Sequence, residues 1–234
     1  MAKVQAPIVP PRLFRYRSLD RSEDALAEEI YSMNSGSIYC ADFTAMNDPM
    51  EGLFRSAASL KEADNYRKIL ERLRDQKSNI GISCFCEAYN QTIMWAHYAE
   101  NFKGICLGYS TQALLDSLPN DVKLIRVAYV DAPPQLTATH VDDIMEAACR
   151  VLSQKHYDWS YEREWRILAA RGLVSCKRSS LRSVYLGTRI SDEQRREIEN
   201  AVRALNNSDI DATNIKVYKM TVSGYSPKKE RIDI

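Results

Sequence analysis

The sequence predicts an α+β fold with a mixed or antiparallel sheet and interspersed helices. Strand-type and helix-type segments follow one another irregularly along the 234 residues, without the regular β-α-β period of a parallel sheet. Neither a glycine-rich dinucleotide fingerprint nor a phosphate-binding loop occurs. Because 45% of the residues are hydrophobic, the chain can bury one substantial core. We therefore expect residues 1–234 to form a single domain, with residues 1–11 as a flexible N-terminal segment.

The strand-type segments are short runs of apolar, β-branched and aromatic residues that end at turn residues. They are predicted at residues 13–17, 38–43, 80–86, 105–109, 122–130, 181–186 and 215–222. The turn Asn47-Asp-Pro49 follows the second of these strands, and its proline disfavours a helical conformation at Asp48.

Capping signals and helical spacing of apolar residues mark the helices. Asp20-Arg-Ser-Glu23 and Ser191-Asp-Glu-Gln194 are typical helix starts, whereas Asn34-Ser-Gly36 and Gly104 are typical ends. Helices are expected at about residues 20–34, 57–76, 91–101, 141–154 and 191–205.

Composition argues against several classes of protein. With 32 basic and 31 acidic residues the net charge is +1, so no global field attracts nucleic acid or an anionic membrane. This balance is still compatible with a local basic patch. The N-terminus lacks the apolar core of a signal peptide, and no apolar run is long enough to span a bilayer. We expect a cytoplasmic protein without a membrane partner.

The cysteines and histidines follow no metal-ligand spacing. Cys84 and Cys86 would share one face of a strand, but no Cys-x-x-Cys pair and no neighbouring histidine completes a zinc site. We expect six free thiols in a reducing compartment and no metal site.

The stretch Asp158-Trp-Ser-Tyr-Glu-Arg-Glu-Trp-Arg-Ile-Leu168 gathers aromatic and charged side chains before an apolar run. As a strand, it places Glu162, Glu164 and Arg166 on one face. As a helix, it gives an ordinary surface pair between Glu162 and Arg166. The aromatic content and the Ile167-Leu168 run favour the strand.

Five ordered motifs resemble a bacterial family known as domain of unknown function 2971. They cover most of the chain, and the family name implies no activity. The motifs are Leu13-Phe-Arg-Tyr-Arg-Ser18, Phe43-Thr-Ala-Met-Asn-Asp-Pro49, Ile82-Ser-Cys-Phe85, Met94-Trp-Ala-His-Tyr-Ala99 with Lys103-Gly104, and Tyr161-Glu-Arg-Glu-Trp-Arg166.

A more distant resemblance is to NAD-dependent ADP-ribosyltransferases, whose pattern is an arginine, a serine and a late Glu-x-Glu. Here Arg15 with Tyr16 matches the first position, Ser83 the second, and Glu162-x-Glu164 the third. The second motif departs from the usual Ser-Thr-Ser, since it reads Ile-Ser-Cys-Phe. The resemblance implies an ADP-ribosyltransferase-like fold, NAD as substrate, and for transfer a protein or nucleic-acid acceptor that it does not identify.

The resemblance also implies roles for these residues. Cleavage of the bond between nicotinamide and ribose develops positive charge on the sugar, which Glu164 would stabilise while Glu162 orients the nucleophile. The remaining candidates would bind the cofactor: Arg15 at the diphosphate, Ser83 at the ribose or at Glu164, Tyr16 or Trp95 stacked on nicotinamide, and the turn residues Asn47 and Asp48.

Each of these residues has a structural interpretation as well. Glu162 and Glu164 would pair with Arg163, Arg166 or Lys155 around a structural tryptophan, and Asp48 would cap backbone amides in its turn. Arg15 and Arg17 would be solvated charges, Ser83 an ordinary strand residue, and Trp95 and Tyr98 part of the core.

Two other function classes stay open. A metal-dependent nuclease would use Asp48, Glu162 and Glu164, but the lysine expected two positions after an acidic residue is missing. A non-catalytic domain that binds a ligand or a protein would show an exposed aromatic patch at Trp159, Tyr161 and Trp165.

Overall fold

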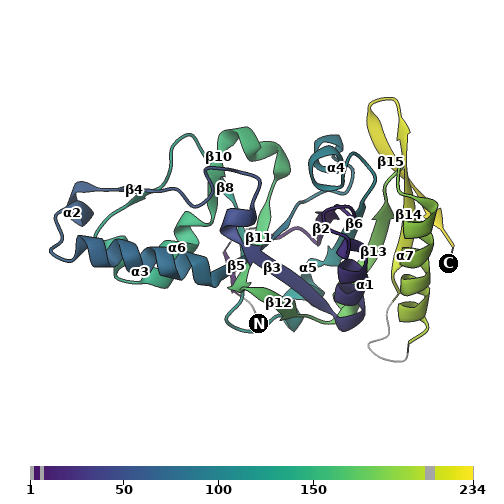
Figure 1. The fold of residues 1–234 in the computed structure, drawn as a ribbon, viewed down its shortest axis with the longest axis horizontal. Helices are drawn as coiled ribbons and strands as arrows, with labels where there is room; N and C mark the ends of the chain where they lie inside the picture. The colour runs from purple at the N-terminus through teal and green to yellow at the C-terminus, as the bar shows by residue number, and fades with distance from the viewer. Residues whose placement is uncertain (1–2, 6–7, 209–213, 234) are drawn as a thin grey trace.

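Two larger β-sheets make up most of the strand structure (Figure 1). They share one hydrophobic core and meet at a backbone bridge. The computed structural model describes residues 3–5, 8–208 and 214–233. A six-stranded sheet runs in the order β1-β7-β11-β5-β3-β12, and a five-stranded sheet runs in the order β15-β14-β13-β6-β2. Phe14 and Cys86 exchange backbone hydrogen bonds of 2.9 and 2.7 Å, which join the sheets. Both sheets contain parallel and antiparallel pairs, so the predicted α+β class with a mixed sheet is confirmed.

The elements have the following bounds. The six-stranded sheet contains β1 (Lys3–Gln5), β3 (Ser37–Asp42), β5 (Ile80–Phe85), β7 (Lys123–Arg126), β11 (Trp165–Ala170) and β12 (Gly172–Ser175). The five-stranded sheet contains β2 (Arg12–Arg17), β6 (Ile105–Ser110), β13 (Leu181–Leu186), β14 (Lys216–Ser223) and β15 (Ser226–Ile232). Two short pairs are β8 (Ala128–Val130) with β10 (Gln154–His156), and β4 (Arg55–Ser56) with β9 (Gln135–Leu136).

The helices connect these strands. The α-helices are α1 (Ala25–Ser35), α2 (Ala58–Lys61), α3 (Tyr66–Asn79), α4 (Thr92–Tyr98), α5 (Thr111–Ser117), α6 (Ile144–Val151) and α7 (Asp192–Asn206). Shorter 3₁₀ turns are η1 (Phe43–Ala45), η2 (Thr139–Val141), η3 (Tyr157–Glu162) and η4 (Arg178–Ser180).

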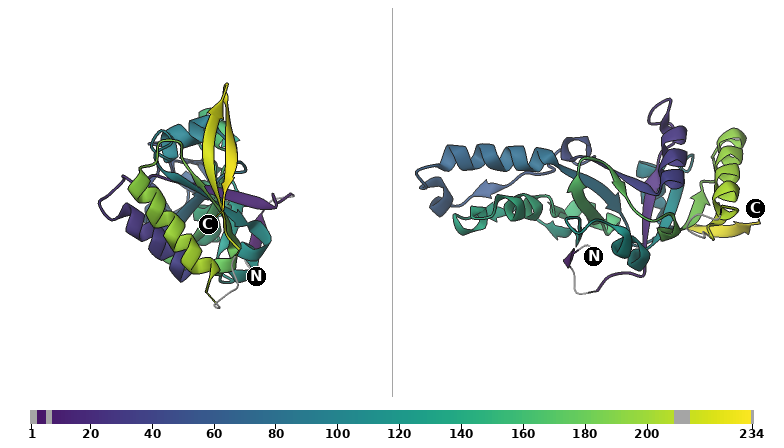
Figure 2. Two further views of the ribbon diagram at one scale, coloured as in Figure 1. Left: turned by 90° about the vertical axis from the view of Figure 1, so that its right-hand side faces the viewer. Right: turned by 90° about the horizontal axis from the view of Figure 1, so that it is seen from below.

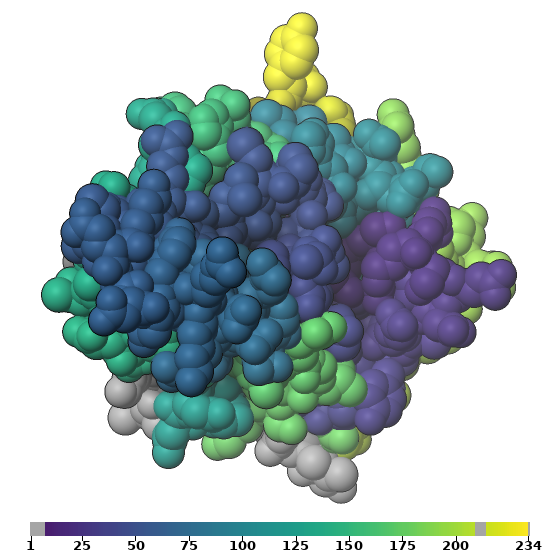
Figure 3. Space-filling model, turned by 60° about the vertical axis from the view of Figure 1, so that its left-hand side comes forward, coloured from purple at the N-terminus to yellow at the C-terminus, as the bar shows by residue number. Residues whose placement is uncertain are grey.

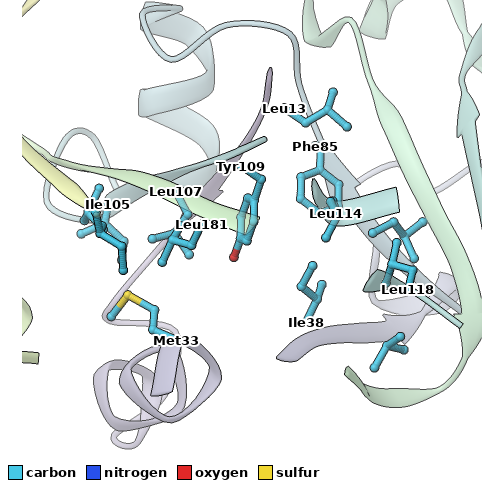
Figure 4. Close-up of a cluster of buried hydrophobic side chains, with 14 of the residues drawn as sticks. Leu13, Met33, Ile38, Phe85, Ile105, Leu107, Tyr109, Leu114, Leu118 and Leu181 are labelled. Atoms are coloured by element: carbon cyan, nitrogen blue, oxygen red, sulfur yellow. The ribbon is translucent and has the colours of Figure 1, made fainter. Parts of the chain in front are cut away.

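The main core lies between the facing sides of the two sheets, closed by α1, α5 and α7. Alternation along each strand sends every second apolar side chain inward, as at Leu13 of β2, Ile38 of β3 and Leu107 of β6. Figure 4 shows these side chains with Met33 of α1 and Leu114 of α5 in the same cluster. Burial of this continuous apolar surface is the main force that holds the sheets together.

The outer faces of the sheets carry two further clusters. Helices α3 and α6 cover the outer face of the six-stranded sheet, where Leu73 and Ala148 pack against Ile82 and Leu168. Helix α4 covers part of the outer face of the five-stranded sheet, through Met94 and Trp95. Helices α2 and α3 lie at one end of the molecule and α7 with β14 and β15 at the other (Figure 2).

Several predicted boundaries are corrected by the structure. Helix α1 begins at Ala25 after Asp24, so the signal at residues 20–23 does not cap it, although Gly36 ends it in the left-handed conformation as expected. The predicted helix at 57–76 is two helices, α2 and α3, and the predicted strand at 122–130 is broken into β7 and β8. The capping box at Ser191 is confirmed, since its side chain accepts a hydrogen bond from the backbone of Gln194.

Helix α4 is shorter than the predicted 91–101 because the chain turns sharply after Tyr98. Three consecutive residues, Glu100, Asn101 and Phe102, have φ of 51°, 50° and 69°, a left-handed backbone that non-glycine residues rarely adopt. The turn places Gly104 against β2, where a Cβ atom on residue 104 would lie 2.1 Å from the carbonyl oxygen of Arg17. Glycine is therefore required at this position.

Some features of the chain fall outside the sequence prediction. Helix α5 and strands β12 and β15 were not predicted, and Lys3–Gln5 form β1 beside β7 within the expected flexible segment. The rest of that segment at residues 1–2 and 6–7 lies outside the described residues. All six cysteines are free thiols. In the described part of the chain, no helix has the length and apolar character needed to cross a membrane.

Candidate functional site

Five charged side chains are buried together where the outer face of the six-stranded sheet meets α4 and the turn before α2. They are Glu51, Lys155, Glu162, Glu164 and Arg166. A buried charge is costly unless it is paired and hydrogen-bonded, so the contacts of each member decide what the cluster can do. We refer to these five residues as the buried ion cluster.

The local backbone brings the two glutamates that precede β11 together. Arg163, with φ of 45°, ends the 3₁₀ turn η3 and turns the chain into β11, so Glu162 and Glu164 lie on either side of a left-handed residue. A non-glycine residue in this conformation is strained and persists only where its surroundings hold it. The predicted continuous strand over residues 158–168 is therefore wrong before Trp165, because residues 157–162 form η3.

Arg166 is the centre of the cluster. Its Nε donates to Oε1 of Glu164 at 2.8 Å, and its Nη2 donates to Oε2 of Glu164 at 3.1 Å. Its Nη1 and Nη2 donate to the two carboxylate oxygens of Glu51 at 2.7 and 2.8 Å, and Nη1 also donates to the backbone oxygen of Leu152 at 2.7 Å. A guanidinium group has five N–H donors, and all five are used here.

Lys155 links the two glutamates. Its Nζ lies 2.7 Å from Oε2 of Glu162 and 3.5 Å from Oε2 of Glu164. The ammonium group also lies 4.4 Å from the ring centroid of Trp159, within the range of a cation–π contact. Strand β10 sets this position by pairing Lys155 with Tyr129 of β8, whose hydroxyl accepts a hydrogen bond from the backbone of Glu164.

The two carboxyl groups differ in proton affinity. Burial, and next the charge of Glu164, raise the pKa of Glu162 above its usual value, and Lys155 offsets only part of this rise. Burial would also raise the pKa of Glu164, but Arg166 and Lys155 together lower it to about 2. The hydroxyl of Tyr98 donates a short hydrogen bond to Oε1 of Glu162. Glu164 is thus the stronger acid of the pair and is ionised at neutral pH, whereas Glu162 holds its proton more tightly.

A small cavity of about 70 Å³ adjoins this end of the cluster. We call it the glutamate cavity. Its polar wall holds Lys155, Glu162, Glu164, Tyr98 and the exposed Asn47, and its apolar wall consists of Phe14, Tyr16, Met46, Cys84, Phe85, Cys86 and Met94. Burial, and next the charge of Glu164, raise the pKa of the Cys84 thiol well above its usual value, so the thiol stays protonated.

Four of the predicted site residues line this cavity. They are Glu162, Glu164, Tyr16 and Asn47. Asp48 lies nearby, where its carboxylate accepts the backbone N–H of Met50 at 2.9 Å and lines a second cavity of about 50 Å³ that shares Lys155. Its predicted capping role in the turn is confirmed. Trp95 packs edge-on against Tyr16 at 5.3 Å and donates to the backbone of Tyr89, which places it behind the cavity wall.

Arg15 and Ser83 lie elsewhere. Alternation along β2 turns Arg15 away from Tyr16 into a separate groove of about 730 Å³, where its guanidinium donates to the backbone oxygen of Tyr39. Ser83 is paired with Ile167 on the face of β5 opposite to Cys84, and its hydroxyl is buried without a protein partner. The motif order predicts that Tyr16 or Arg15 converges with Ser83 and Glu164 in one pocket large enough for a dinucleotide. Tyr16 and Glu164 do share the glutamate cavity, but Arg15 and Ser83 do not line it, and the cavity is too small for a dinucleotide.

Four residues without a predicted site role belong to the site: Lys155 and Tyr98 line the cavity, and Arg166 and Glu51 complete the buried ion cluster. The sequence predicted ion pairs for Lys155 and Arg166, a core position for Tyr98, and no role for Glu51. The aromatic patch that would favour protein binding is not formed, because Trp165 is fully buried and donates to Glu87, while Trp159 and Tyr161 are half-buried.

Part of the site lies within a segment that matches a protein-family model. Residues 94–167 match the family model described as Protein of unknown function (DUF2971). The match covers less than half of the chain but includes Tyr98, Lys155, Glu162, Glu164 and Arg166. It supports the resemblance carried by the later motifs. No match was found among curated proteins or among solved structures.

The low pKa of Glu164 predicts a specific loss of stability in acid. Its folded pKa of about 2 lies below its usual value of 4.5, so its contribution is complete above pH 4.5 and is lost as the pH falls toward 2. Across that window we expect the wild type to lose about 3 kcal/mol more unfolding free energy than Glu164→Gln. Urea unfolding at several pH values measures the difference, and parallel curves for the two proteins would contradict it.

Proposed function

We propose that the glutamate cavity is a catalytic site that cleaves the N-glycosidic bond of NAD or a related nucleotide, as an NAD glycohydrolase or an ADP-ribosyltransferase. One observation carries this proposal. Glu162, whose pKa is raised, and Glu164, whose pKa is lowered, contact the same ammonium group at the wall of a largely apolar cavity. Pairs of this kind separate the roles of a permanent anion and a proton acceptor.

The chemistry assigns one role to each carboxyl group. The bond between C1′ of the ribose and the nicotinamide nitrogen breaks, and its electron pair leaves with the neutral nicotinamide. Glu164 stays ionised and stabilises the positive charge that develops on the ribose. Water, or the hydroxyl or amine of an acceptor, forms the new bond to C1′ and gives its proton to Glu162. Lys155 and Tyr98 hold the Glu162 carboxyl in place through its two oxygens.

The size of the cavity limits what enters it. A volume of about 70 Å³ is several times what one water molecule needs, but it is far below the roughly 300–1,000 Å³ of a site that encloses a whole drug-sized ligand. In this proposal the flat nicotinamide ring and the ribose carbon bonded to it enter, between the aromatic and sulfur-containing wall and the two carboxyl groups. The rest of the dinucleotide lies outside, past Asn47 and Tyr98. Arg15 then has no part in binding the diphosphate.

The proposal is tested first with the wild-type chain. Purified protein is incubated with NAD, with and without candidate protein and nucleic-acid acceptors, and the release of nicotinamide is followed by chromatography. We expect steady release that depends on the amount of protein. A preparation that neither binds nor consumes NAD under any of these conditions would defeat the proposal.

A non-catalytic role is the alternative that a specific observation favours. Every N–H donor of Arg166 has a protein acceptor, and both glutamates are ion-paired, so the cluster is also complete as a structural unit. The metal-dependent nuclease receives no such support. Among the described residues, no group of three or more His, Cys, Asp and Glu side chains could hold a metal ion, and Glu51 and Glu164 are instead bridged by Arg166.

A further inference from the structure

A cationic groove lies on the outer face of the five-stranded sheet and shares Phe14 with the wall of the glutamate cavity. It has a volume of about 620 Å³, and Arg12, Arg182 and Lys216 contribute its positive charges, with Phe14 in its wall. Strand alternation puts Arg12 and Phe14 on one face of β2, and Lys216 and Tyr218 on the same face of the sheet in β14. We call this surface the cationic groove.

The positive charges of the groove are not neutralised by protein carboxylates. Among the described residues, Arg12, Arg182 and Lys216 form no ion pair, and the one glutamate in the lining, Glu87, is engaged by Arg126 and by Trp165. Lys229 of β15 extends the charge onto the β14–β15 hairpin. Burial, and then the nearby charges of Arg12 and Lys216, lower the pKa of Lys229, which shows that these cations act on one another. Such a group of cations attracts an anion.

A row of aromatic rings continues from the groove. Phe14 contacts Tyr89 and Tyr185, with ring centroids 5.7 and 6.0 Å apart. Tyr185 is stacked on Tyr89 and on Tyr218, with ring centroids 4.5 and 5.1 Å apart. The Lys229 ammonium lies 4.6 Å from the Tyr89 ring and 4.5 Å from the Tyr218 ring, so half-buried ring faces and a cation occur together.

We propose that this face binds single-stranded nucleic acid, with phosphates at the cations and bases stacked on Tyr218 and Tyr89. A cationic track beside aromatic rings is the arrangement by which proteins hold single strands without reading a fixed sequence. The register pairs Lys229 with Met220, four residues from Lys216 along β14, so the backbone positions of the two lysines are about 13 Å apart. Cations distributed along the sheet in this way can contact successive phosphates of a strand.

The shape of the molecule leaves room for a strand. The β14–β15 hairpin projects beyond the body of the protein (Figure 1), and its tip stands clear in the space-filling view (Figure 3). Helix α7 packs on the opposite face of the sheet, where Val202 and Val217 share the main core. The net charge of only +1 means that binding depends on this local patch rather than on a global field.

The experiment measures fluorescence anisotropy of labelled single strands of thymidine or uridine nucleotides, each about 12 residues long. We expect wild-type binding to weaken as salt rises from about 50 to 200 mM. Lys216→Ala should weaken binding and lower the slope of log affinity against log salt by about 0.7. Tyr218→Ala should weaken it about tenfold or more with the slope kept, whereas Tyr218→Phe, which retains the ring, should bind like wild type. Comparison of the two strands separates DNA from RNA.

Lys219→Ala is the matched control. Lys219 is an exposed lysine on the same strand, but alternation places it on the opposite face, across from Glu230. It should leave affinity and salt slope unchanged. The proposal is overturned if wild-type protein does not bind either strand at about 50 mM salt, or if Lys216→Ala and Lys219→Ala weaken binding equally. Since Lys216 is exposed, its variant should fold even if Tyr218→Ala does not. The assay uses no NAD and is independent of the proposed reaction.

Discussion

Replacing Arg166 by methionine is expected to lower the free energy of unfolding by about 3–5 kcal/mol. The variant keeps much of the side-chain volume but removes the cation that bridges Glu51 and Glu164. Two buried carboxylates would then lose their principal partner, and the backbone oxygen of Leu152 would lose its donor. Equilibrium unfolding in urea at neutral pH measures the change.

Two further arginine variants separate charge from geometry. Arg166→Lys keeps the positive charge but offers only three donors on one nitrogen, so it cannot serve both carboxylates and Leu152, and we expect an intermediate loss. Arg171→Met removes an arginine close by in sequence whose side chain is 53% exposed and 3.0 Å from Asp42. An exposed pair contributes about 0–1 kcal/mol. Equal losses at Arg166 and Arg171, or no loss at Arg166, would show that the buried ion cluster does not hold the fold together.

Sequence patterns predicted the fold best where a local signal and the tertiary environment agree. Strands β2, β3, β5, β6 and β13 were predicted and are mostly buried, and Ser191 caps the start of α7 as expected. Strand β15 was missed because Ser226–Ile232 is mostly charged and exposed, and only its ladder with β14 makes it a strand. The propensity of such a segment is overridden by its partner.

The candidate site was predictable only in part, because proximity depends on contacts far apart in the sequence. The Glu-x-Glu motif did identify two members of the cluster, but their proximity depends on the left-handed backbone of Arg163. This conformation is usually marked in a sequence by glycine or asparagine, so an arginine gave no signal of it. Lys155 reaches them because β10 pairs with β8, and Glu51 because the turn after Pro49 folds over β11. The order of motifs along the chain also does not determine the face of the sheet on which a side chain lies. Ser83 and Cys84 are neighbours in sequence, but alternation along β5 places them on opposite faces.

Glu162→Gln is expected to lower the rate of NAD cleavage about 10²–10⁴-fold, with little change in KM. This expectation rests on the proposed function. The amide retains an oxygen that can accept from Tyr98, and it has nearly the same volume, so substrate binding should persist while the proton acceptor is lost. Because the pKa of Glu162 is raised, wild-type kcat/KM should rise with pH through a limb above the usual carboxyl range, and this limb should be absent from the variant.

Stability distinguishes this catalytic role from a structural one. The pKa of Glu162 is raised on folding, so its contribution is complete below pH 4.5 and is lost as the pH rises through the folded pKa. Removing the ionisable group therefore costs little stability at neutral pH. Glu164→Gln should behave differently, because the carboxylate that it removes has a lowered pKa and neutralises the charges of Arg166 and Lys155. This variant should therefore lower both the melting temperature and the rate. Glu71→Gln, an exposed glutamate on α3, serves as the control that changes neither. If instead Glu162→Gln lost turnover only in proportion to the fraction of unfolded protein, Glu162 would be a structural partner of Lys155 and not a proton acceptor.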